Sequence, residues 1–160
     1  AVCGIGLLQK APFRMKAEPK WGSRHILQLN WVFGEFFVRP DAWSELIDSL
    51  GLHVAPVESV DGRPLHTVQQ LMIDADIDVD TASLRGTPCA ACGRVKYEPH
   101  VRGPFPRPAE PPSSLVVRTR QWFGSGASAF QPVLIHRSVR EAMVAARLKG
   151  ASFTPAVNPH

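Results

Sequence analysis

The sequence predicts a small α+β protein, built from short strands and two main helices in a single compact domain. Hydrophobic residues make up 44% of the 160 and charged residues 20%, which is an ordinary globular composition. Short apolar runs broken by glycine and proline predict the strands, and two stretches carry the signals of a helix start and end. A chain of this length suits one domain over residues 1–160, with two lobes, 1–84 and 85–160, as the other arrangement considered.

The first part of the chain predicts strands on either side of a helix. Residues 24–38 are rich in Ile, Leu, Val, Trp and Phe, which favours one or two strands. Residues 42–50 place apolar side chains on one helical face, and Gly51 stands where a left-handed residue commonly ends a helix. A short strand over 52–57 and an Asp-Gly turn at 61–62 follow.

Alternating aspartates give residues 71–84 a different pattern. Apolar residues at 73, 75, 77 and 79 alternate with Asp74, Asp76, Asp78 and Asp80. This period of two predicts a strand with one acidic face. Such a face usually keeps the outer side of a strand in water and discourages edge pairing. In a protein that binds another protein, Asp74, Asp76 and Asp78 could instead contact a basic patch of that partner, where charge complementarity speeds association.

Prolines dominate residues 98–113 and exclude a helix or central strand there. We expect an extended connector over this range. Residues 115–123 and 132–136 then read as strands, with a turn over 124–127 between them.

The last helix is predicted from its ends. Ser138 and Glu141 match the Ser-x-x-Glu capping box, and Gly150 is placed to end the helix. A short final strand is expected around Phe153.

The three cysteines carry the clearest chemistry in the sequence. Cys89 and Cys92 lie in the sequence Cys-Ala-Ala-Cys-Gly, and this spacing forms a tight knuckle that supplies half of a tetrahedral zinc site. The chain starts Ala-Val-Cys3-Gly4, so a cysteine directly before Ala1 would complete a second motif of the same form. We therefore expect two knuckles sharing one structural zinc ion, with the N-terminus truncated inside the first. The fourth ligand is either that upstream cysteine or His100.

The sequence favours neither a redox dithiol nor a disulfide at these cysteines, and it shows no catalytic motif. A redox dithiol normally opens a helix after a strand, whereas Pro88 precedes this pair and a proline-rich coil follows it. A disulfide between Cys89 and Cys92 is geometrically awkward at this spacing. No two histidines have the spacing of a metal pair on one helix, and no serine stands in a Gly-x-Ser-x-Gly motif. We expect no catalytic residues and no enzyme activity.

These features resemble the double-CXXCG motif family of myxobacterial proteins. The matching parts are Cys3-Gly4, the motif at 89–93, and two C-terminal patterns, Pro-Val-Leu-Ile-His-Arg-Ser-Val-Arg-Glu-Ala-Met at 132–143 and Leu-Lys-Gly-Ala-Ser-Phe at 148–153. The family includes Sit-type immunity proteins, which protect kin cells from toxins. The resemblance implies a zinc-stabilised immunity protein that binds and neutralises a cognate toxin.

Charge and hydropathy bear on the partner and the location. The net charge of +4 combines −4 over residues 1–84 with +8 over residues 85–160. The basic second half makes a zinc-ribbon-like nucleic-acid-binding module the alternative function. No apolar run is long enough to span a membrane and no secretory leader stands at the start of the sequence. A cytoplasmic protein that does not bind membranes is expected.

Overall fold

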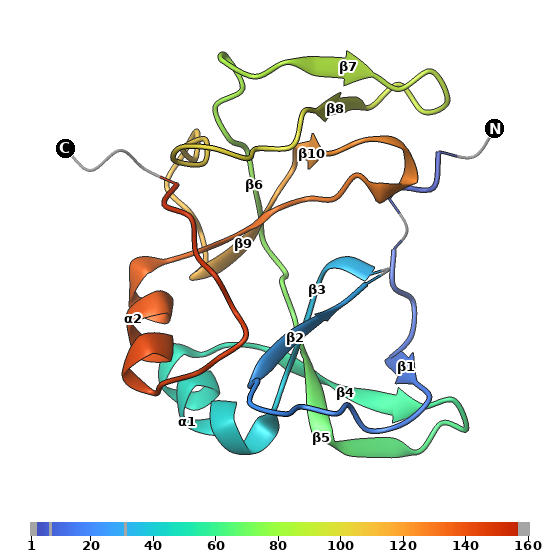
Figure 1. Cartoon of the computed structure of the whole chain (residues 1–160), viewed down its shortest axis with the longest axis vertical. Helices are drawn as coiled ribbons and strands as arrows, with labels where there is room; N and C mark the ends of the chain where they lie inside the picture. The colour runs from blue at the N-terminus through green and yellow to red at the C-terminus, as the bar shows by residue number, and fades with distance from the viewer. Residues whose placement is uncertain (1–2, 7, 31, 157–160) are drawn as a thin grey trace. The chain divides into compact units, whose positions relative to one another are not determined.

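The computed structural model describes residues 3–6, 8–30 and 32–156 of the chain. They form an α+β fold of two α-helices and several short strands in small sheets, which confirms the predicted fold class (Figure 1). The chain divides into two compact units: unit 1 comprises Ala1–Leu7, Asp74–Leu134 and Phe153–His160, and unit 2 comprises Leu8–Ile73 and Ile135–Ser152. The predicted extent of the domain, with a lobe boundary after residue 84, stays a prediction.

Unit 2 is built on a five-stranded sheet with the order β1-β4-β5-β3-β2. Its strands are β1 (Phe13–Met15), β2 (Ile26–Leu29), β3 (Val32–Val38), β4 (Val54–Ser59) and β5 (Pro64–Leu71). β1 and β4 are parallel, and the other neighbouring pairs are antiparallel. The predicted strand region at 24–38 is therefore the β2–β3 pair, and the predicted turn at 61–62 joins β4 to β5. β5 was not predicted, because its residues do not alternate regularly between apolar and polar.

Apolar side chains from several strands form the core of unit 2. Met15, Phe37, Val57 and Val68 are buried together, and partly buried apolar side chains pack around them: Phe13, Trp21, Leu27, Leu29 and Leu65. The rings of Phe13 and Phe37 meet edge to face, with centroids 4.8 Å apart. Burial of these side chains is the main force holding the sheet together.

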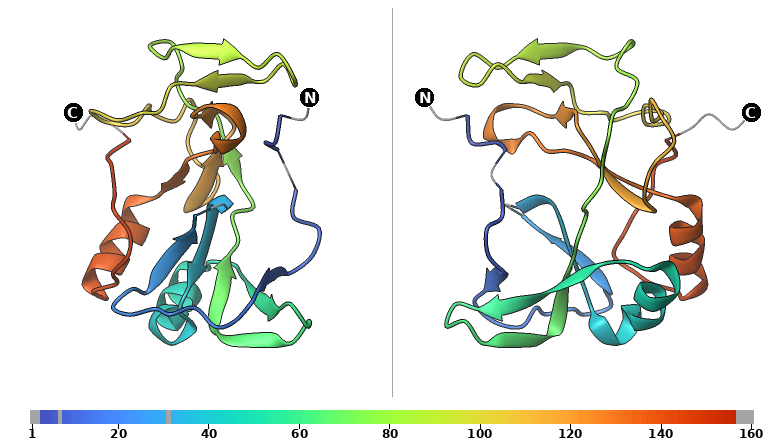
Figure 2. Two further views of the ribbon diagram at one scale, coloured as in Figure 1. Left: turned by 45° about the vertical axis from the view of Figure 1, so that its right-hand side comes forward. Right: turned by 180° about the vertical axis from the view of Figure 1, so that it is seen from behind.

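Two helices complete unit 2 and lie side by side (Figure 2). α1 (Pro40–Leu50) buries Trp43 and Leu46, and Gly51 ends it in the left-handed conformation, as predicted. α2 spans Arg137–Ala145.

The predicted ends of α2 are wrong by a few residues. Its N-cap is His136, not Ser138, because the extended backbone of His136 lets its Nδ1 accept a hydrogen bond from the Ser138 N–H at 3.2 Å. At the other end, Arg147 takes a positive φ of 54° and reverses the chain before Gly150. Gly150 serves another contact: with a φ of 112°, it lies so close to the Ile26 carbonyl that a Cβ would sit 2.3 Å from that oxygen. No strand forms among the described residues after α2, which include Phe153.

Unit 1 contains two three-stranded sheets, with orders β10-β8-β7 and β11-β9-β6. Their strands are β6 (Asp76–Ile77), β7 (Gly86–Pro88), β8 (Val95–Tyr97), β9 (Val116–Thr119), β10 (Trp122–Phe123) and β11 (Val133–Ile135). A 3₁₀ turn, η1 (Gly126–Ser128), lies where the turn at 124–127 was predicted. The proline-rich residues 98–113 form no helix or named strand, in agreement with the predicted connector.

The acidic strand is shorter than its pattern suggests. Regular pairing within 71–84 after β5 is limited to β6, which pairs in parallel with β9, and to an isolated bridge at Val79. The alternation itself is nevertheless real, since Ile77 and Val79 are buried while Asp74 and Asp76 are exposed. The prolines opposite this segment limit further pairing, because a proline has no N–H to donate.

Candidate metal centre

A tight hairpin presents the Cys89 and Cys92 thiols. β7 and β8 pair antiparallel up to Pro88 and Val95, and the intervening residues form the turn. The Cys89 N–H donates to the Arg94 carbonyl at 2.9 Å, and the Gly93 N–H donates to the Cys89 carbonyl at 2.8 Å. Gly93 closes this turn with a φ of 71°, a conformation that glycine adopts without strain. The knuckle predicted from the Cys-x-x-Cys-Gly spacing is present.

The third thiol comes from the start of the chain. Cys3 is followed by Gly4, which has a φ of 77° and lies against Ala127, where a Cβ would approach the alanine side chain to 2.8 Å. The residues Ala1 and Val2, on which the rest of the predicted first knuckle depends, lie outside the described part of the chain. Gly4 and Gly93, which each follow a cysteine of the cluster, both have a positive φ.

The three sulfur atoms lie close enough together to hold a metal ion. The Sγ atoms of Cys3 and Cys89 are 3.4 Å apart, and those of Cys3, Cys89 and Cys92 all lie within 4.8 Å of one another. Zinc bound by thiolates has Zn–S distances of about 2.3 Å, so tetrahedral geometry puts neighbouring sulfurs about 3.8 Å apart. The three thiols are unbridged and partly buried. The three thiols could therefore hold a metal ion, and a tetrahedral site would take a fourth ligand.

Hydrogen-bond donors around the cluster favour thiolate at Cys89. Its pKa is lowered to about 6, chiefly by the Ala91 N–H and then by hydrogen bonds from the Cys3 thiol and the Cys92 N–H. The pKa of Cys3 is raised instead: the Lys96 ammonium lowers it, but the neighbouring Cys92 and Cys89 sulfurs and partial desolvation outweigh that effect. Backbone amides aimed at sulfur are what a knuckle supplies to a metal thiolate.

Lys96 also belongs to this site, although the sequence pattern did not predict it. It extends from β8, and its Nζ lies 3.1 Å from the Cys3 Sγ and 2.7 Å from the Gly126 carbonyl oxygen. Its own pKa is raised, first by the hydrogen bond to Cys3. Three thiolates around a divalent ion carry one net negative charge, which an adjacent ammonium offsets. No sequence signal connects Lys96 with a cysteine 93 positions away.

His100 lies outside the thiol cluster. Its Nε2 lies 3.2 Å from the Gly103 carbonyl oxygen, and its ring packs edge-on against Phe105. Within the described ranges, the residues grouped with metal-ligating distances are Cys3, Cys89 and Cys92 alone. The structure therefore does not bring the predicted histidine donor together with the three sulfurs.

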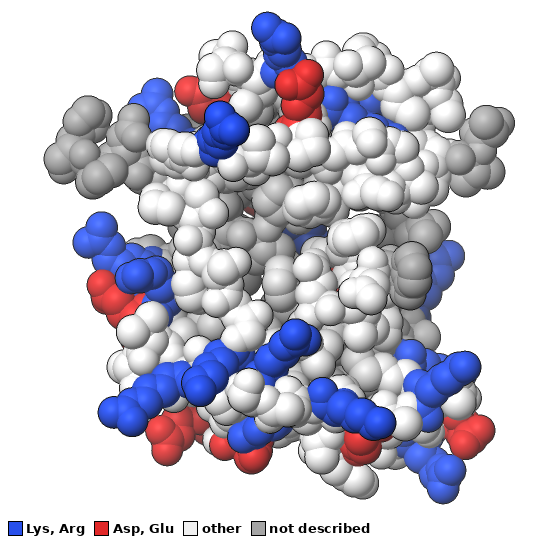
Figure 3. Space-filling view, in the orientation of Figure 1, with Lys and Arg blue, Asp and Glu red and all other residues white. Residues whose placement is uncertain are grey.

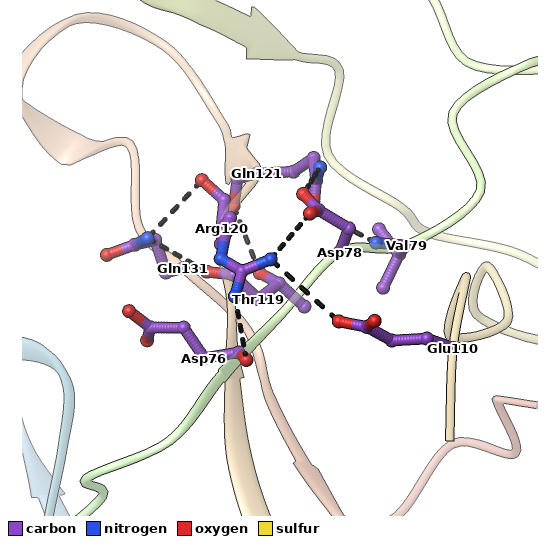
Figure 4. A network of polar contacts seen from close by, with 8 residues as sticks. All are labelled: Asp76, Asp78, Val79, Glu110, Thr119, Arg120, Gln121 and Gln131. Carbon is purple, nitrogen blue, oxygen red and sulfur yellow. Dashed lines mark hydrogen bonds and ion pairs between the residues drawn. The ribbon is translucent and has the colours of Figure 1, made fainter. Parts of the chain in front are cut away.

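The predicted partner-binding aspartates are only partly available. Asp78 receives hydrogen bonds from Arg120 at 2.6 Å and from the Gln121 Nε2 at 2.8 Å (Figure 4). These bonds, that from Gln121 first, lower the pKa of Asp78. Arg120 also donates to the Asp76 carbonyl oxygen at 3.4 Å and lies 4.0 Å from Glu110. Asp74 and Asp76 have exposed side chains on the same segment, and Asp78 is hydrogen-bonded within unit 1.

Folding removes most of the charge asymmetry seen along the sequence. Unit 1 contains seven Lys and Arg against six Asp and Glu, and unit 2 contains eleven against eight. The change arises because the acidic residues 74–84 belong to unit 1, whereas the basic residues 135–152 belong to unit 2. Within unit 1, the acidic segment forms the Asp78–Arg120 and Asp80–Arg107 ion pairs. The basic second half of the sequence is thus divided between the two units.

Comparison of the chain with known proteins found no similar protein. No protein-family model matches the chain, and no curated protein or solved structure matches it. None of the helices among the described residues has the length and apolar character required to cross a membrane. Fold and site together define a small α+β protein with a three-thiol centre that could hold a metal ion.

Proposed function

We propose that this protein binds one structural zinc ion through Cys3, Cys89 and Cys92. The observation that carries this proposal is the convergence of three thiols from two segments 86 residues apart within 4.8 Å. Three soft sulfur donors at tetrahedral spacing suit zinc, and backbone amides stabilise the required thiolate. The ion would act as a cross-link that fixes the start of the chain to the β7–β8 hairpin.

The working role of this scaffold is stoichiometric binding, as an immunity protein that neutralises a cognate toxin in the cytoplasm. Two observations support this role. The residues shared with the double-CXXCG pattern, Cys3-Gly4 and the motif at 89–93, are the residues that build the thiol cluster. The thiols are also free, as is usual for cysteines in a reducing compartment.

Metal analysis of the purified chain tests the first part. We expect one zinc per chain, and loss of zinc when Cys3 or Cys92 is replaced by serine. Replacement of the exposed Ser23 by alanine is the matched control and should leave the zinc content unchanged. A wild-type chain without zinc, whose thiols are all alkylated under native conditions, would overturn the metal site.

Co-expression tests the second part. The probe is the product of the gene that neighbours this protein's own, produced in cells with and without the chain. Protection of growth together with a stoichiometric complex in size-exclusion chromatography is expected. Growth arrest in the presence of the folded, zinc-loaded chain would refute neutralisation while leaving the metal site standing.

A further inference from the structure

Unit 2 carries a group of exposed Lys and Arg side chains that the sequence pattern did not predict. The basic band, as we name it, consists of Lys16, Lys20, Arg24, Arg147 and Lys149, all with exposed side chains. Figure 3 shows Lys and Arg side chains gathered over the segment between β1 and β2 and the end of α2. In the part of the chain that the structure describes, none of these five side chains forms an ion pair.

Backbone contacts bring the two halves of the band together. The His25 N–H donates to the Lys149 carbonyl at 2.8 Å, and the Lys149 N–H donates to the His25 Nδ1 at 3.0 Å. Gly150 lies against Ile26 and against the Cβ of Arg24. Arg24 and Lys149 therefore occupy adjoining positions, although they are 125 residues apart in sequence.

The segment that carries Lys16, Lys20 and Arg24 has no helix or strand, yet it is firmly held. Glu18 accepts hydrogen bonds from the backbone N–H groups of His66 and Thr67, on β5, at 2.6 and 3.2 Å. Trp21 packs against the core cluster. The carboxylate of this segment, Glu18, is thus bound by β5, and the cations are presented from a fixed backbone. A binding surface held in place in this way costs little entropy to engage.

The second segment of the band includes an unusual backbone conformation. Arg147 is the non-glycine residue with a positive φ in the described chain, at 54°. Such a conformation costs about 1–2 kcal/mol and persists where surrounding contacts fix it. Here the Leu148 N–H donates to the Met143 carbonyl at 2.9 Å, and the following residues dock on His25. The turn directs 147–149 along the edge that Arg24 occupies.

We propose that the basic band is the surface that binds an acidic patch on a protein partner. This inference rests on the proposed function, since it assigns the face that meets the toxin. It places that contact on cations of unit 2 in place of Asp74, Asp76 and Asp78, of which Asp78 is already paired. Unpaired, fixed cations supply charge complementarity without first breaking an internal ion pair.

The surroundings of the band favour a protein over nucleic acid. Unit 2 also carries eight acidic residues, among them exposed Asp41, Asp48 and Glu141 on its helices. Such carboxylates repel a long polyphosphate, whereas a short acidic segment of a protein can contact the band alone. The aromatic residue within the segment, Trp21, is packed on the core with its indole nitrogen buried, so it offers no platform for stacking bases.

Two charge-reversal variants of the full chain test the proposal. The band variant combines Lys20→Glu with Lys149→Glu, and the control combines Arg85→Glu with Arg102→Glu on exposed positions of unit 1. Both change the net charge by the same amount. Circular dichroism and zinc content of each variant are compared with wild type, so that a folding defect is recognised.

The probes are a polyglutamate peptide and a DNA duplex of equal total charge, titrated at low and physiological salt. We expect wild type to bind polyglutamate more tightly than DNA, the band variant to lose about tenfold or more in affinity, and the control to retain it. Equal losses in both variants, tighter binding to DNA, or no binding to either probe would each overturn the proposal. Because the toxin is not a probe here, such a failure leaves neutralisation to be judged by the growth assay.

Discussion

Removal of the proposed zinc ion by a chelator should lower the free energy of unfolding. The size of this loss depends on the number of residues in the loop that the ion closes. The thiols of Cys3 and Cys89 are 86 residues apart. For a cross-link of that span, the lost entropy of the unfolded chain corresponds to about 4–5 kcal/mol. In a protein of this size, each kcal/mol shifts the melting temperature by about 2–4 °C, so removal of the ion is expected to lower it by about 10 °C or more.

Differential scanning calorimetry of zinc-loaded and chelated protein measures this shift. The Cys3→Ser variant is the control, because it retains the hairpin cysteines but lacks the long cross-link. Its melting temperature should match that of the chelated wild type and should not respond to chelator. Equal melting temperatures for zinc-loaded and chelated wild type, with one zinc bound per chain beforehand, would refute the reasoning that the ion closes this loop.

Three further predictions concern single side chains. Lys96→Met removes the cation beside the thiols and should weaken zinc binding by about 10- to 100-fold in a competitive chelator titration. Lys96→Arg keeps the charge and should have an intermediate affinity. Unchanged affinity in Lys96→Met would exclude a role for this cation in zinc binding. Asp78→Asn should lower stability at neutral pH by up to about 1 kcal/mol by removing the partly exposed pair with Arg120. Because the pKa of Asp78 is lower in the folded than in the unfolded protein, its carboxylate stabilises the fold above the unfolded pKa, and this stabilisation is lost as pH falls through the folded pKa. If wild type and Asp78→Asn differed equally in melting temperature down to strong acid, this prediction would be wrong. Gly51→Ala should cost about 1 kcal/mol of stability because of its positive φ, and Gly150→Ala should cost more, because at position 150 the added Cβ would also clash with the Ile26 carbonyl oxygen. Equal denaturant midpoints for the two variants would show that this clash relaxes freely.

Features decided by neighbouring residues were predicted well. The turn of the Cys89–Cys92 knuckle, the end of α1 at Gly51 and the extended path of residues 98–113 all follow from the φ preferences of glycine and proline. The ends of α2 were predicted less well. Two capping signals overlap there, and the His136 imidazole takes the position that the sequence suggested for Ser138.

Features that join distant segments were out of reach of local patterns. β5 owes its place in the middle of a sheet to the strands on either side, since its own sequence mixes apolar and polar residues without regular alternation. The acidic segment showed its alternation in sequence, but its pairing with Arg120 depended on the position of β9 and β10. Lys96 likewise meets Cys3, and the two segments of the basic band meet through Lys149 and His25; the residues of each pair are more than 90 positions apart.

The sequence by itself determined the cysteine knuckle, because the Cys-x-x-Cys-Gly spacing sets it through local backbone geometry, and it indicated a soft metal ion, because thiolates favour such ions. It also determined the mixture of helices and strands, since hydrophobic period and helix-end signals act over a few residues. Only the tertiary structure decided that Cys3 meets that knuckle, that Lys96 stands beside it, and which charges stay unpaired. Those outcomes depend on closing long loops, where the free energy comes from packing across the whole core rather than from any neighbouring residue.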